Sequence, residues 1–585
     1  MKIFLPKIFV IFLAWVIISC QKENVEYDLV IYGGTSAGVT AAVQATRLNK
    51  SVLIIEPGTE QQLGGLTTGG LGRTDFGNKR IIGGISLEFY KEINKYYLND
   101  SNWTWQNRSE YFKNQTYHPG ATNIEEESMW FFEPSAARSI FQHWIQKYNI
   151  PVLYGERIIR EGEGKAIEKE GGWKVAVPGS VSDGVVKKDG KITEIVMESG
   201  TRIKARYFID ATYEGDLLAG AGVSFTVGRE GFDIYEESLN GIRTKLSIPD
   251  SGMPAWRHHQ FEPAVDPYVV QGNPDSGLLP MIKSNGPGTE GKSDHKIQAY
   301  CFRMCLTDVP ENRISFEKPE GYNELDYELL LRNYEAGFSR LPWINSPMPN
   351  RKTDTNNQSA FSTDFIGANY DYPEASYAER KNIVDAHLQY QMGLMWTLAN
   401  HPRIPDDIRT EMSRWGVTKD EFVEGNGWQD QLYIREARRM ISDVVMTQHH
   451  CQGKVVENES IGMGAYGMDS HHTQRYVDEN GSVKNEGDVQ IGLRKPYPIS
   501  YKSILPKETE CANLLVPVCL SASHIAFGSI RMEPVFMVLG QSAAIAACMA
   551  IDKDCSLQEI PYAELKQKLQ SAGQILNLED IPQQK

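Results

Sequence analysis

The chain has 585 residues, of which 41% are hydrophobic and 23% are charged, and its formal net charge at pH 7 is −15. This length predicts two or three domains, and the composition is ordinary for a globular protein. The acidic balance argues against binding to nucleic acid or to an anionic membrane surface.

The N-terminus predicts export from the cell. A basic start leads into an apolar run over residues 8–18, which is too short to span a bilayer but suits the core of a signal peptide. The run ends in Ser19 and Cys20, which resembles a bacterial lipobox. We therefore expect a signal peptide over 1–20, a lipid anchor on Cys20, a polar tether over 21–26, and a periplasmic or cell-surface location. A plain secretory signal with an incidental cysteine is the alternative.

Residues 27–56 have the plan of a dinucleotide-binding βαβ unit. An apolar run ends at Tyr32, small residues form a turn, and a helical stretch leads to a second apolar run that closes at Glu56. The helix N-terminus points unpaired N–H groups at a pyrophosphate, and Glu56 is placed to accept hydrogen bonds from a ribose hydroxyl. The candidate cofactor-binding residues of this unit are Gly33, Gly34, Thr35, Ser36, Ala37, Gly38 and Glu56.

Thr35 departs from the G-x-G-x-x-G pattern, because it stands where the pattern has its middle glycine. An ordinary βα turn of another α/β protein is the alternative reading. The strand, helix, strand and acid in register nevertheless favour a nucleotide site. We expect the small Thr35 side chain to let a pyrophosphate approach and to be able to donate a hydrogen bond to it.

Glycines crowd the next segment, residues 63–72, which indicates backbone lying close to a large or flat group. A disordered linker is the alternative there. The pattern then predicts helices over 84–90 and 134–148 and a strand over 151–154. Strand-like runs with glycine turns over 155–209 are typical of a small antiparallel meander. The last run ends at Asp210 and is followed by a polar turn and a short helix.

The middle of the chain, residues 226–425, is rich in proline and poor in periodicity. It predicts an inserted cap with few regular elements. A helix is expected to begin near residue 430, with its buried side marked by Leu432, Ala437, Met440, Ile441, Val444 and Val445. Arg435, Arg438 and Arg439 fall on the other side of this helix, where a solvated charged face is the expected role.

Residues 513–550 predict a buried strand over 513–518, a glycine-containing loop and a helix over 534–550. Many small residues in that helix imply close approach to another element or to a ligand. Residues 462–467 match G-x-G-x-x-G letter for letter, but neither a strand precedes them nor a helix follows. We therefore expect no dedicated NAD(P)H domain.

Seven cysteines follow Cys20, and an odd number in an exported protein cannot all pair with one another. Most lie in apolar runs, so free buried thiols are expected rather than a disulfide framework. Cys301 and Cys305 have no second ligand pair nearby in the sequence, so no metal site is expected.

Several long motifs occur in an order that resembles the FAD-dependent oxidoreductase family over nearly all of residues 27–555. They are GGTSAG (33–38), LGGLTTGGLG (63–72), FEP (132–134), FIDATYEGDLLA (208–219), CLTDVPENR (305–313), YIREARR (433–439), DSHHTQR (469–475) and ASHIAFGSIRMEPVFMVLGQSAA (522–544).

The resemblance implies an α/β fold with a Rossmann-like FAD-binding domain, which has a central parallel sheet and a small antiparallel meander, and an inserted irregular cap region for the substrate. It divides the chain into a first FAD-binding part (27–225), the insert (226–425), a second FAD-binding part (426–560) and a tail (561–585). FAD is the implied cofactor. The further residues implied in binding it are Gly64, Gly65, Thr67, Asp210, Ala211, Gly528, Gly540 and Gln541.

Flavin chemistry predicts hydride transfer between a substrate C–H and flavin N5, with a side chain that manages the coupled proton. His524 is the first candidate for that side chain, followed by His471 and His472, and a structural histidine is the alternative for each. Arg531 can stabilise the reduced flavin or hold a substrate carboxylate. Arg475 and Arg435 are weaker candidates for anion binding.

The leading hypothesis is a lipid-anchored FAD-dependent oxidoreductase that acts on a small polar organic molecule, a sugar or a carboxylic acid. It contacts the membrane only through its anchor, and its electron acceptor is left open. A flavin-fold lipoprotein that binds glycans without turnover is the second hypothesis. A polysaccharide lyase is the third. Because the signal lacks twin arginines, we expect FAD to be acquired after export.

Overall fold

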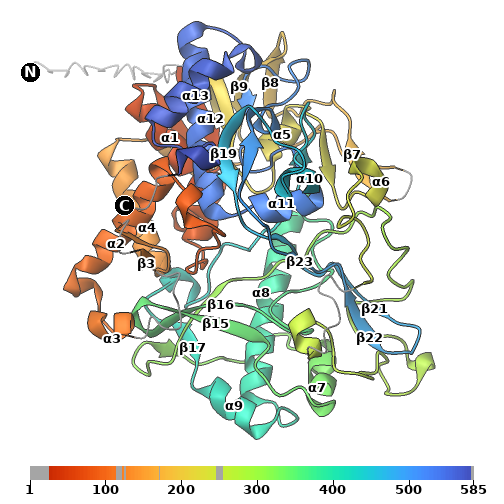
Figure 1. Ribbon diagram of the computed structural model, residues 1–585. Coiled ribbons are helices and arrows are strands. Elements are labelled where there is room, and N and C mark those ends of the chain that lie inside the picture. The colour runs from red at the N-terminus through yellow and green to blue at the C-terminus, as the bar shows by residue number, and fades with distance from the viewer. Residues whose placement is uncertain (1–25, 114–121, 124–126, 170–171, 246–253, 582–585) are drawn as a thin grey trace, which may run out of the picture.

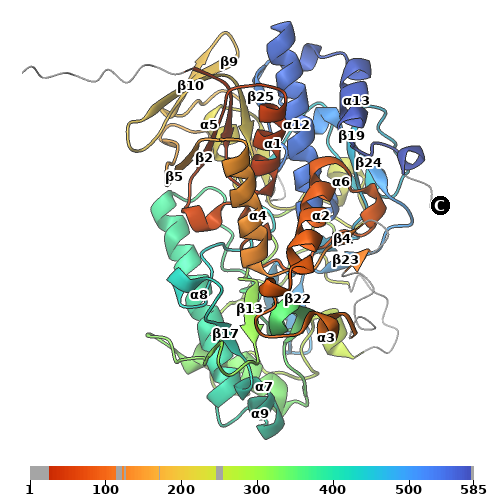
Figure 2. The ribbon, with the colours of Figure 1, turned by 90° about the vertical axis from the view of Figure 1, so that its left-hand side faces the viewer.

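The computed structural model describes residues 26–113, 122–123, 127–169, 172–245 and 254–581. The predicted signal peptide, Cys20 and nearly all of the tether lie outside these residues. The described residues form two large hydrophobic cores and a small cluster of Cys305, Met348 and Phe422. The larger core unites the segments predicted to bind FAD, and the smaller core lies in the insert. Figures 1 and 2 both show the part of the insert that contains α7, α8 and α9 at the lower end of the molecule.

A seven-stranded sheet forms the centre of the larger body. Its strands are β1 (Glu26–Tyr32), β2 (Val52–Glu56), β5 (Val152–Tyr154), β8 (Val185–Lys188), β9 (Lys191–Val196), β10 (Arg202–Asp210) and β25 (Leu514–Leu515). The order is β5-β2-β1-β10-β9-β8, and β25 also pairs with β10. Pairing is parallel from β5 to β10 and to β25, whereas β8 and β9 are an antiparallel extension. This arrangement confirms the predicted Rossmann-like fold and its meander.

The register of this sheet gathers the predicted nucleotide-binding residues. Tyr32, the last residue of β1, stands beside Asp210, the last residue of β10, and beside Ile55 of β2. Parallel strands present their carboxyl ends at one edge, where α/β folds bind their ligands. The turn after β1, the end of β2 and the segment after β10 therefore meet at that edge.

Helices α1 (Ser36–Arg47), α2 (Gly84–Leu98), α4 (Pro134–Lys147) and α12 (Glu533–Lys553) pack on the larger body, and Figure 2 shows them side by side. The predicted helices over 84–90, 134–148 and 534–550 are confirmed. Of the helices described, α12 alone has the length and apolar composition to cross a membrane, and it is completely buried. An added Cβ at Gly540 would lie 2.2 Å from the carbonyl oxygen of Ala37. The small residues of α12 thus serve close packing on α1.

The insert is more regular than its sequence predicts. An antiparallel five-stranded sheet has the order β14-β17-β13-β16-β15, and α8 has 24 residues. Pro347 falls in the edge strand β15, where a missing N–H is tolerated, and Ser376 with Glu379 forms a capping box at the start of α8. Proline content therefore did not indicate irregular structure here, because Pro347 lies in an edge strand and the capping box starts a long helix. The elements are β13 (Met304–Thr307), β14 (Arg313–Ile314), α7 (Glu328–Glu335), β15 (Trp343–Met348), β16 (Lys352–Asn357), α8 (Tyr377–Asn400), α9 (Asp406–Ser413) and β17 (Gly416–Thr418).

Part of the predicted second FAD-binding part (426–560) joins the insert. Strand β21 (Gln474–Val477) pairs with β12 (Ile282–Lys283) of the insert and with β22 (Val483–Glu486), and Val483 belongs to the smaller core. Another small sheet has the order β18-β11-β7-β6. Its strands are β6 (Ile167–Glu168), β7 (Lys174–Ala176), β11 (Phe225–Val227) and β18 (Arg439–Met440).

The predicted helix near residue 430 is wrong. Residues 431–446 are extended and include only the short strand β18, while α10 (Gln448–Cys451) begins later. Arg435, Arg438 and Arg439 are at most 1% exposed, so the expected solvated face is also wrong. Acidic side chains from distant segments surround this segment on several sides. The ion pairs of these three arginines therefore determine the conformation of the segment, although its apolar spacing matches that of a helix.

Residues 462–467 do not form a second dinucleotide turn. Strand β19 (Ser460–Gly464) runs through them and is followed by β20 (Met468–Ser470), which supports rejecting the motif. All seven described cysteines are free thiols, and only Cys555 is not fully buried, as predicted. The remaining elements are α3 (Arg108–Lys113), β3 (Thr122–Asn123), β4 (Ser128–Met129), α5 (Asp216–Gly220), α6 (Phe232–Tyr235), β23 (Val489–Ile491), β24 (Tyr497–Ser500), α11 (His524–Ile530) and α13 (Tyr562–Ser571).

Candidate functional site

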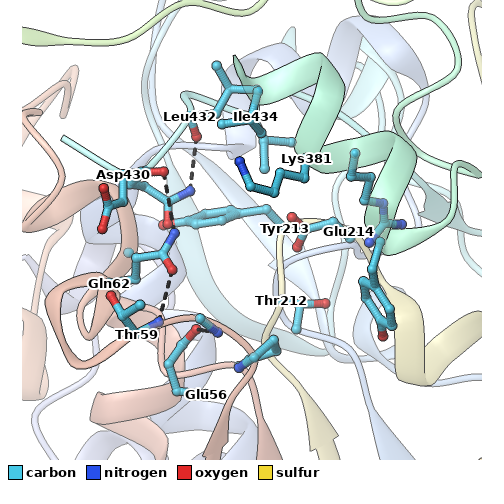
Figure 3. A pocket seen from close by; sticks show the side chains of 18 of the residues that line it. Glu56, Thr59, Gln62, Thr212, Tyr213, Glu214, Lys381, Asp430, Leu432 and Ile434 are labelled. Carbon is cyan, nitrogen blue, oxygen red and sulfur yellow. Dashed lines mark hydrogen bonds between the residues drawn. The ribbon is translucent and has the colours of Figure 1, made fainter. Parts of the chain in front are cut away.

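A cavity of about 490 Å³ opens at the carboxyl edge of the central sheet. Its walls come from the turn after β1, the end of β2, residues 212–216, one side of α8 and residues 429–434. Figure 3 shows the Tyr213 ring lying across the cavity, between Glu56 on one side and Lys381 of α8 on the other. The insert thus contributes one wall of a site whose floor is the βαβ unit.

Two glycines make the turn possible. Gly33 has φ +104°, and an added Cβ would lie 2.7 Å from the carbonyl carbon of Ala211. A Cβ on Gly38 would lie 2.0 Å from the oxygen of Gly33. Both positions therefore exclude a side chain, as the βαβ pattern predicts.

Glu56 lies at the predicted place and lines the cavity. Its two carboxylate oxygens accept hydrogen bonds from the backbone N–H groups of Gly34 and Gly58, each at 2.7 Å. Burial raises the pKa of Glu56 to about 7, against the opposing effect of these two donors. Hydroxyl donors of a bound ribose would favour the ionised form.

Thr35 has a different role from the one predicted. Its hydroxyl donates to the carbonyl oxygen of Ala211 at 2.7 Å and accepts a long hydrogen bond from Gly38 N–H, which makes it the N-cap of α1. A hydroxyl has one hydrogen to donate, so it is not available to a pyrophosphate. The expectation that Thr35 donates to the cofactor is corrected: it fastens the turn to the end of β10.

Glu533, at the N-terminus of α12, is a functional candidate that the sequence interpretation missed. Its buried carboxyl group accepts hydrogen bonds from Ser36 Oγ at 2.6 Å, Thr67 Oγ1 at 2.7 Å and Tyr213 OH at 2.8 Å. Burial raises its pKa. An acid directly before the proline that opens an apolar helix was the available signal. The side chain brings the starts of α1 and α12 together with the glycine-rich segment.

The glycine-rich segment lies beside the nucleotide turn. Gly64 and Gly65 have φ of +96° and +57°, the Gly64 N–H donates to the oxygen of Gly34 at 2.7 Å, and Gly65 lines the cavity. Asp210 lies behind the cavity, where its carboxylate accepts from Thr212 and from Leu218 N–H. It therefore braces the turn after β10.

Of the predicted cofactor residues, Gly33, Thr35, Glu56 and Gly65 line the cavity. Three of the others belong to helices α11 and α12. Gly528 lies in α11, and an added Cβ there would meet the oxygen of Asp469 at 2.3 Å. Gly540 packs on α1, and Gln541 accepts from Ile85 N–H of α2 at 2.8 Å. The predicted loop at 524–530 is instead helix α11. The structure gives all three residues positions in helix packing.

His471 forms a dyad with the buried Asp364, and the partly exposed Asp469 lies on the other side of its ring. Its Nδ1 lies 2.7 Å from Asp364 Oδ2, and its Nε2 lies 3.5 Å from Asp469 Oδ2. Burial and the nearby Arg435 oppose protonation, but the two carboxylates outweigh them and raise the pKa of His471. Sequence reasoning missed Asp364, which is more than one hundred residues away in the chain, and it did not single out Asp469, although Asp469 stands in the same motif as His471.

His524 forms a second dyad. Its Nδ1 lies 2.7 Å from Glu436 Oε2 and its Nε2 lies 2.9 Å from Ser470 Oγ, so both ring nitrogens are hydrogen-bonded. His472, in contrast, is buried with no hydrogen-bond partner for either ring nitrogen among the described residues, and burial lowers its pKa. The three candidate histidines thus have three different environments.

Arg531 connects the start of α12 with the His471 dyad. Its Nη2 donates to Asp469 Oδ2 at 2.9 Å, and its Nη1 donates to Tyr433 OH at 3.3 Å. Two residues further on, Glu533 reaches Ser36 at the start of α1. The segment 531–533 therefore contacts the nucleotide turn through Glu533 and the surroundings of His471 through Arg531.

The arginines of the 433–439 motif hold this region together. Arg435 pairs with Asp364 at 2.9 Å, Arg438 with Asp216 at 2.7 Å, and Arg439 with Glu230 at 2.6 Å. Because each is paired, none is free to bind an anion from solution. The expectation of an anion site at Arg435 is therefore not supported by its geometry.

The match to a protein-family model agrees with the nucleotide site. A family model described as FAD dependent oxidoreductase matches residues 28–569. No curated protein matches the chain. Solved structures similar to part of it include L-amino acid deaminase from Proteus vulgaris, at 14% identity over 34% of this chain and 49% of that chain (TM-score 0.21). Another is L-proline dehydrogenase from P. horikoshii, at 17% identity over 34% of this chain and 55% of that chain (TM-score 0.20). This chain thus spans about half the length of these two proteins.

Proposed function

Since the family match spans residues 28–569, the chain belongs to the FAD-dependent oxidoreductase family, and we propose that it transfers a hydride between FAD and a small polar organic substrate, a sugar or a carboxylic acid. The observation that carries the proposal is the position of residues 531–533, where Glu533 binds Ser36 of the nucleotide turn and Arg531 holds Asp469, which lies beside His471. This short segment connects the cofactor cradle with a group able to move a proton.

The residues present fit the ADP half of FAD. The turn at 33–38 gives close backbone approach and a helix N-terminus, and Glu56 offers carboxylate oxygens at the end of β2. The cavity volume of about 490 Å³ is within the usual range for ligand sites. Gly64 and Gly65 and the start of α12 would hold the flavin end. When bound, FAD supplies the two-electron chemistry.

His471 is the residue we assign to the coupled proton. Its Nδ1 is held close to Asp364, which fixes the ring, whereas the longer distance to Asp469 leaves Nε2 as the nitrogen that exchanges its proton. His524 was the first candidate from sequence. Because both its nitrogens are hydrogen-bonded and it is only 2% exposed, we assign it a positioning role through Ser470.

Arg531 orients Asp469 toward His471 in this scheme. Its positive charge next to the start of α12 also favours negative charge that develops nearby. Both roles follow from one side-chain position.

Anaerobic reduction of the bound flavin tests the proposal. At least one compound from a panel of sugars, uronic acids and other organic acids should bleach the bound flavin. In the His471→Asn variant, with equal FAD content, this bleaching should be about a hundredfold or more slower. His524→Asn is the comparison variant, and its smaller effect is expected because its ring acts through Ser470. A flavin that no compound bleaches would contradict the proposal and favour the non-catalytic glycan-binding alternative.

We also propose that the protein is exported and lipid-anchored through Cys20, and that it meets its substrate outside the cytoplasm. The support is the sequence of residues 8–20 alone.

A further inference from the structure

A second cavity of about 250 Å³ lies in the insert, away from the FAD site. Aromatic rings make up much of its wall, and Arg475 is the only basic residue among its lining residues. Helix α8 presents Gln389 and Tyr390 to this cavity, whereas Lys381, Val384 and Leu388 of the same helix face the FAD cavity. The two cavities are therefore on different sides of α8.

Arg475 differs from every other buried arginine in the part of the chain that the structure describes. It is 1% exposed, yet it has no carboxylate within 4 Å. The eight others each have at least one such partner; they are Arg229, Arg303, Arg332, Arg380, Arg435, Arg438, Arg439 and Arg531. The fold thus neutralises buried guanidinium groups everywhere except at this cavity.

The contacts of Arg475 do not replace an anion. Its Nε donates to Asn485 Oδ1 at 3.2 Å and its Nη2 to the oxygen of Ala360 at 3.3 Å, both neutral and both long. Its guanidinium also lies 4.8 Å from the centre of the Phe361 ring. Burial of a charge without an adjacent counter-charge is costly, and here burial lowers the pKa of Arg475 against the opposing effects of Tyr390 and the more distant Asp364. An anion in the cavity would remove that cost.

The walls indicate what kind of anion fits. Phe365 stacks on Tyr390 with ring centres 4.1 Å apart and planes 4° apart, and Tyr322 stacks on Tyr327 at 5.2 Å and 8°. Flat aromatic walls suit a flat apolar body, and a guanidinium binds a carboxylate with two parallel hydrogen bonds. Asp326 also lines the cavity, which disfavours ligands with more than one negative charge.

We propose that this cavity binds a small monocarboxylate with a flat, apolar body, held by Arg475. The site is separate from the FAD cavity, so the proposal does not depend on the redox reaction.

Benzoate, with benzamide as its neutral isostere, is the probe for this site, and calorimetry and thermal unfolding of the FAD-loaded protein are the measurements. Benzoate should bind and raise the unfolding temperature, and benzamide should do neither. In Arg475→Met the affinity for benzoate should fall about tenfold to a hundredfold. This variant should still fold, because Arg475 has no acidic partner and its removal leaves no buried carboxylate unpaired.

Tyr322→Ala is a second variant that keeps the arginine and removes part of the aromatic wall. This variant should lower the affinity for benzoate, and it should lower the affinity for acetate less, because acetate has no ring. Equal binding of benzoate and benzamide, unchanged affinity in Arg475→Met, or tighter binding of inorganic phosphate than of benzoate would overturn the proposal. A change in the flavin absorption spectrum on adding benzoate that persists in Arg475→Met would also overturn it, since benzoate would then act at the FAD site.

Discussion

Glu56 joins two functions in one side chain. Its oxygens hold the N–H groups of Gly34 and Gly58 and so shape the turns on both sides of the nucleotide cavity. The same carboxylate faces that cavity. A substitution of Glu56 should therefore disturb both the shape of the site and the binding of its ligand.

We predict that Glu56→Gln weakens FAD binding about tenfold to a hundredfold, since charge-assisted hydrogen bonds to the ribose are replaced by neutral ones. The dissociation constant of FAD, measured by flavin fluorescence, checks this. Glu60→Gln is the matched control, because Glu60 is an exposed acid in the same segment. Equal affinity of Glu56→Gln and the wild type would contradict the role of Glu56.

The raised pKa of His471 has a consequence for the pH dependence of flavin reduction. As a base, His471 must be neutral, so the rate should fall as the pH drops through its pKa, which lies above the ordinary value. In Asp364→Asn the imidazolium loses a carboxylate partner, so its pKa falls and the acidic limb moves to lower pH by about one unit.

Stopped-flow reduction from pH 5 to 9 measures this limb. His472→Asn serves as the comparison, because burial already lowers the pKa of His472 and its loss should leave the limb in place. An acidic limb that stays fixed in Asp364→Asn would show that another group sets it.

At the level of elements, the contact between α1 and α12 determines the geometry of the cofactor site. Thr40 Oγ1 of α1 donates to the oxygen of Met537 at 3.0 Å, and Gly540 lies against the Ala37 backbone. This close packing places Glu533 over Ser36. The start of each helix therefore faces the site.

We predict that Gly540→Ala destabilises the protein by about 1 to 3 kcal/mol, because its Cβ meets backbone that cannot move aside. Thermal unfolding and FAD retention are the measurements. Gly425→Ala is the control, since an added Cβ there meets nothing within 4 Å. Equal stability of the two variants would show that the close approach of α1 and α12 does not contribute to the free energy of unfolding.

The elements also show where sequence patterns succeed and fail. The βαβ unit was predictable because its strand, turn and helix are contiguous, so local pattern and fold agree. The segment 431–446 was not, because ion pairs from Asp364, Asp216 and Glu230 hold it extended. Local spacing carries no information about such partners. The capping box at Ser376 was a usable signal for α8 that proline content obscured.

For the whole molecule, α8 fastens the insert to the FAD-binding body. Arg380 of α8 forms two hydrogen bonds with Asp216, at 2.7 and 2.8 Å, next to the turn after β10. Lys381 and Leu388 of the same helix line the FAD cavity. The two bodies therefore share one site rather than acting separately.

We predict that the full-length protein, expressed in a bacterium, partitions into the membrane fraction with a lipid-modified N-terminus at Cys20. The Cys20→Ser variant should be found in the soluble fraction instead, because the acylated Cys20 is the only membrane anchor that we propose. Fractionation with mass spectrometry of the N-terminal peptide checks this. An unmodified N-terminus beginning elsewhere would instead support a plain secretory signal.

The sequence by itself determined the fold class, the FAD family and the nucleotide turn, since these depend on contiguous residues whose spacing reflects local geometry. It also marked His471, Arg531 and Arg475 as candidate residues, with His524 placed before His471. Only the tertiary structure decided that Thr35 caps a helix, that Glu533 joins two helix starts, and that His471 has the carboxylate pair and the freer nitrogen. These outcomes depend on burial and on partners hundreds of residues apart, which no local pattern encodes.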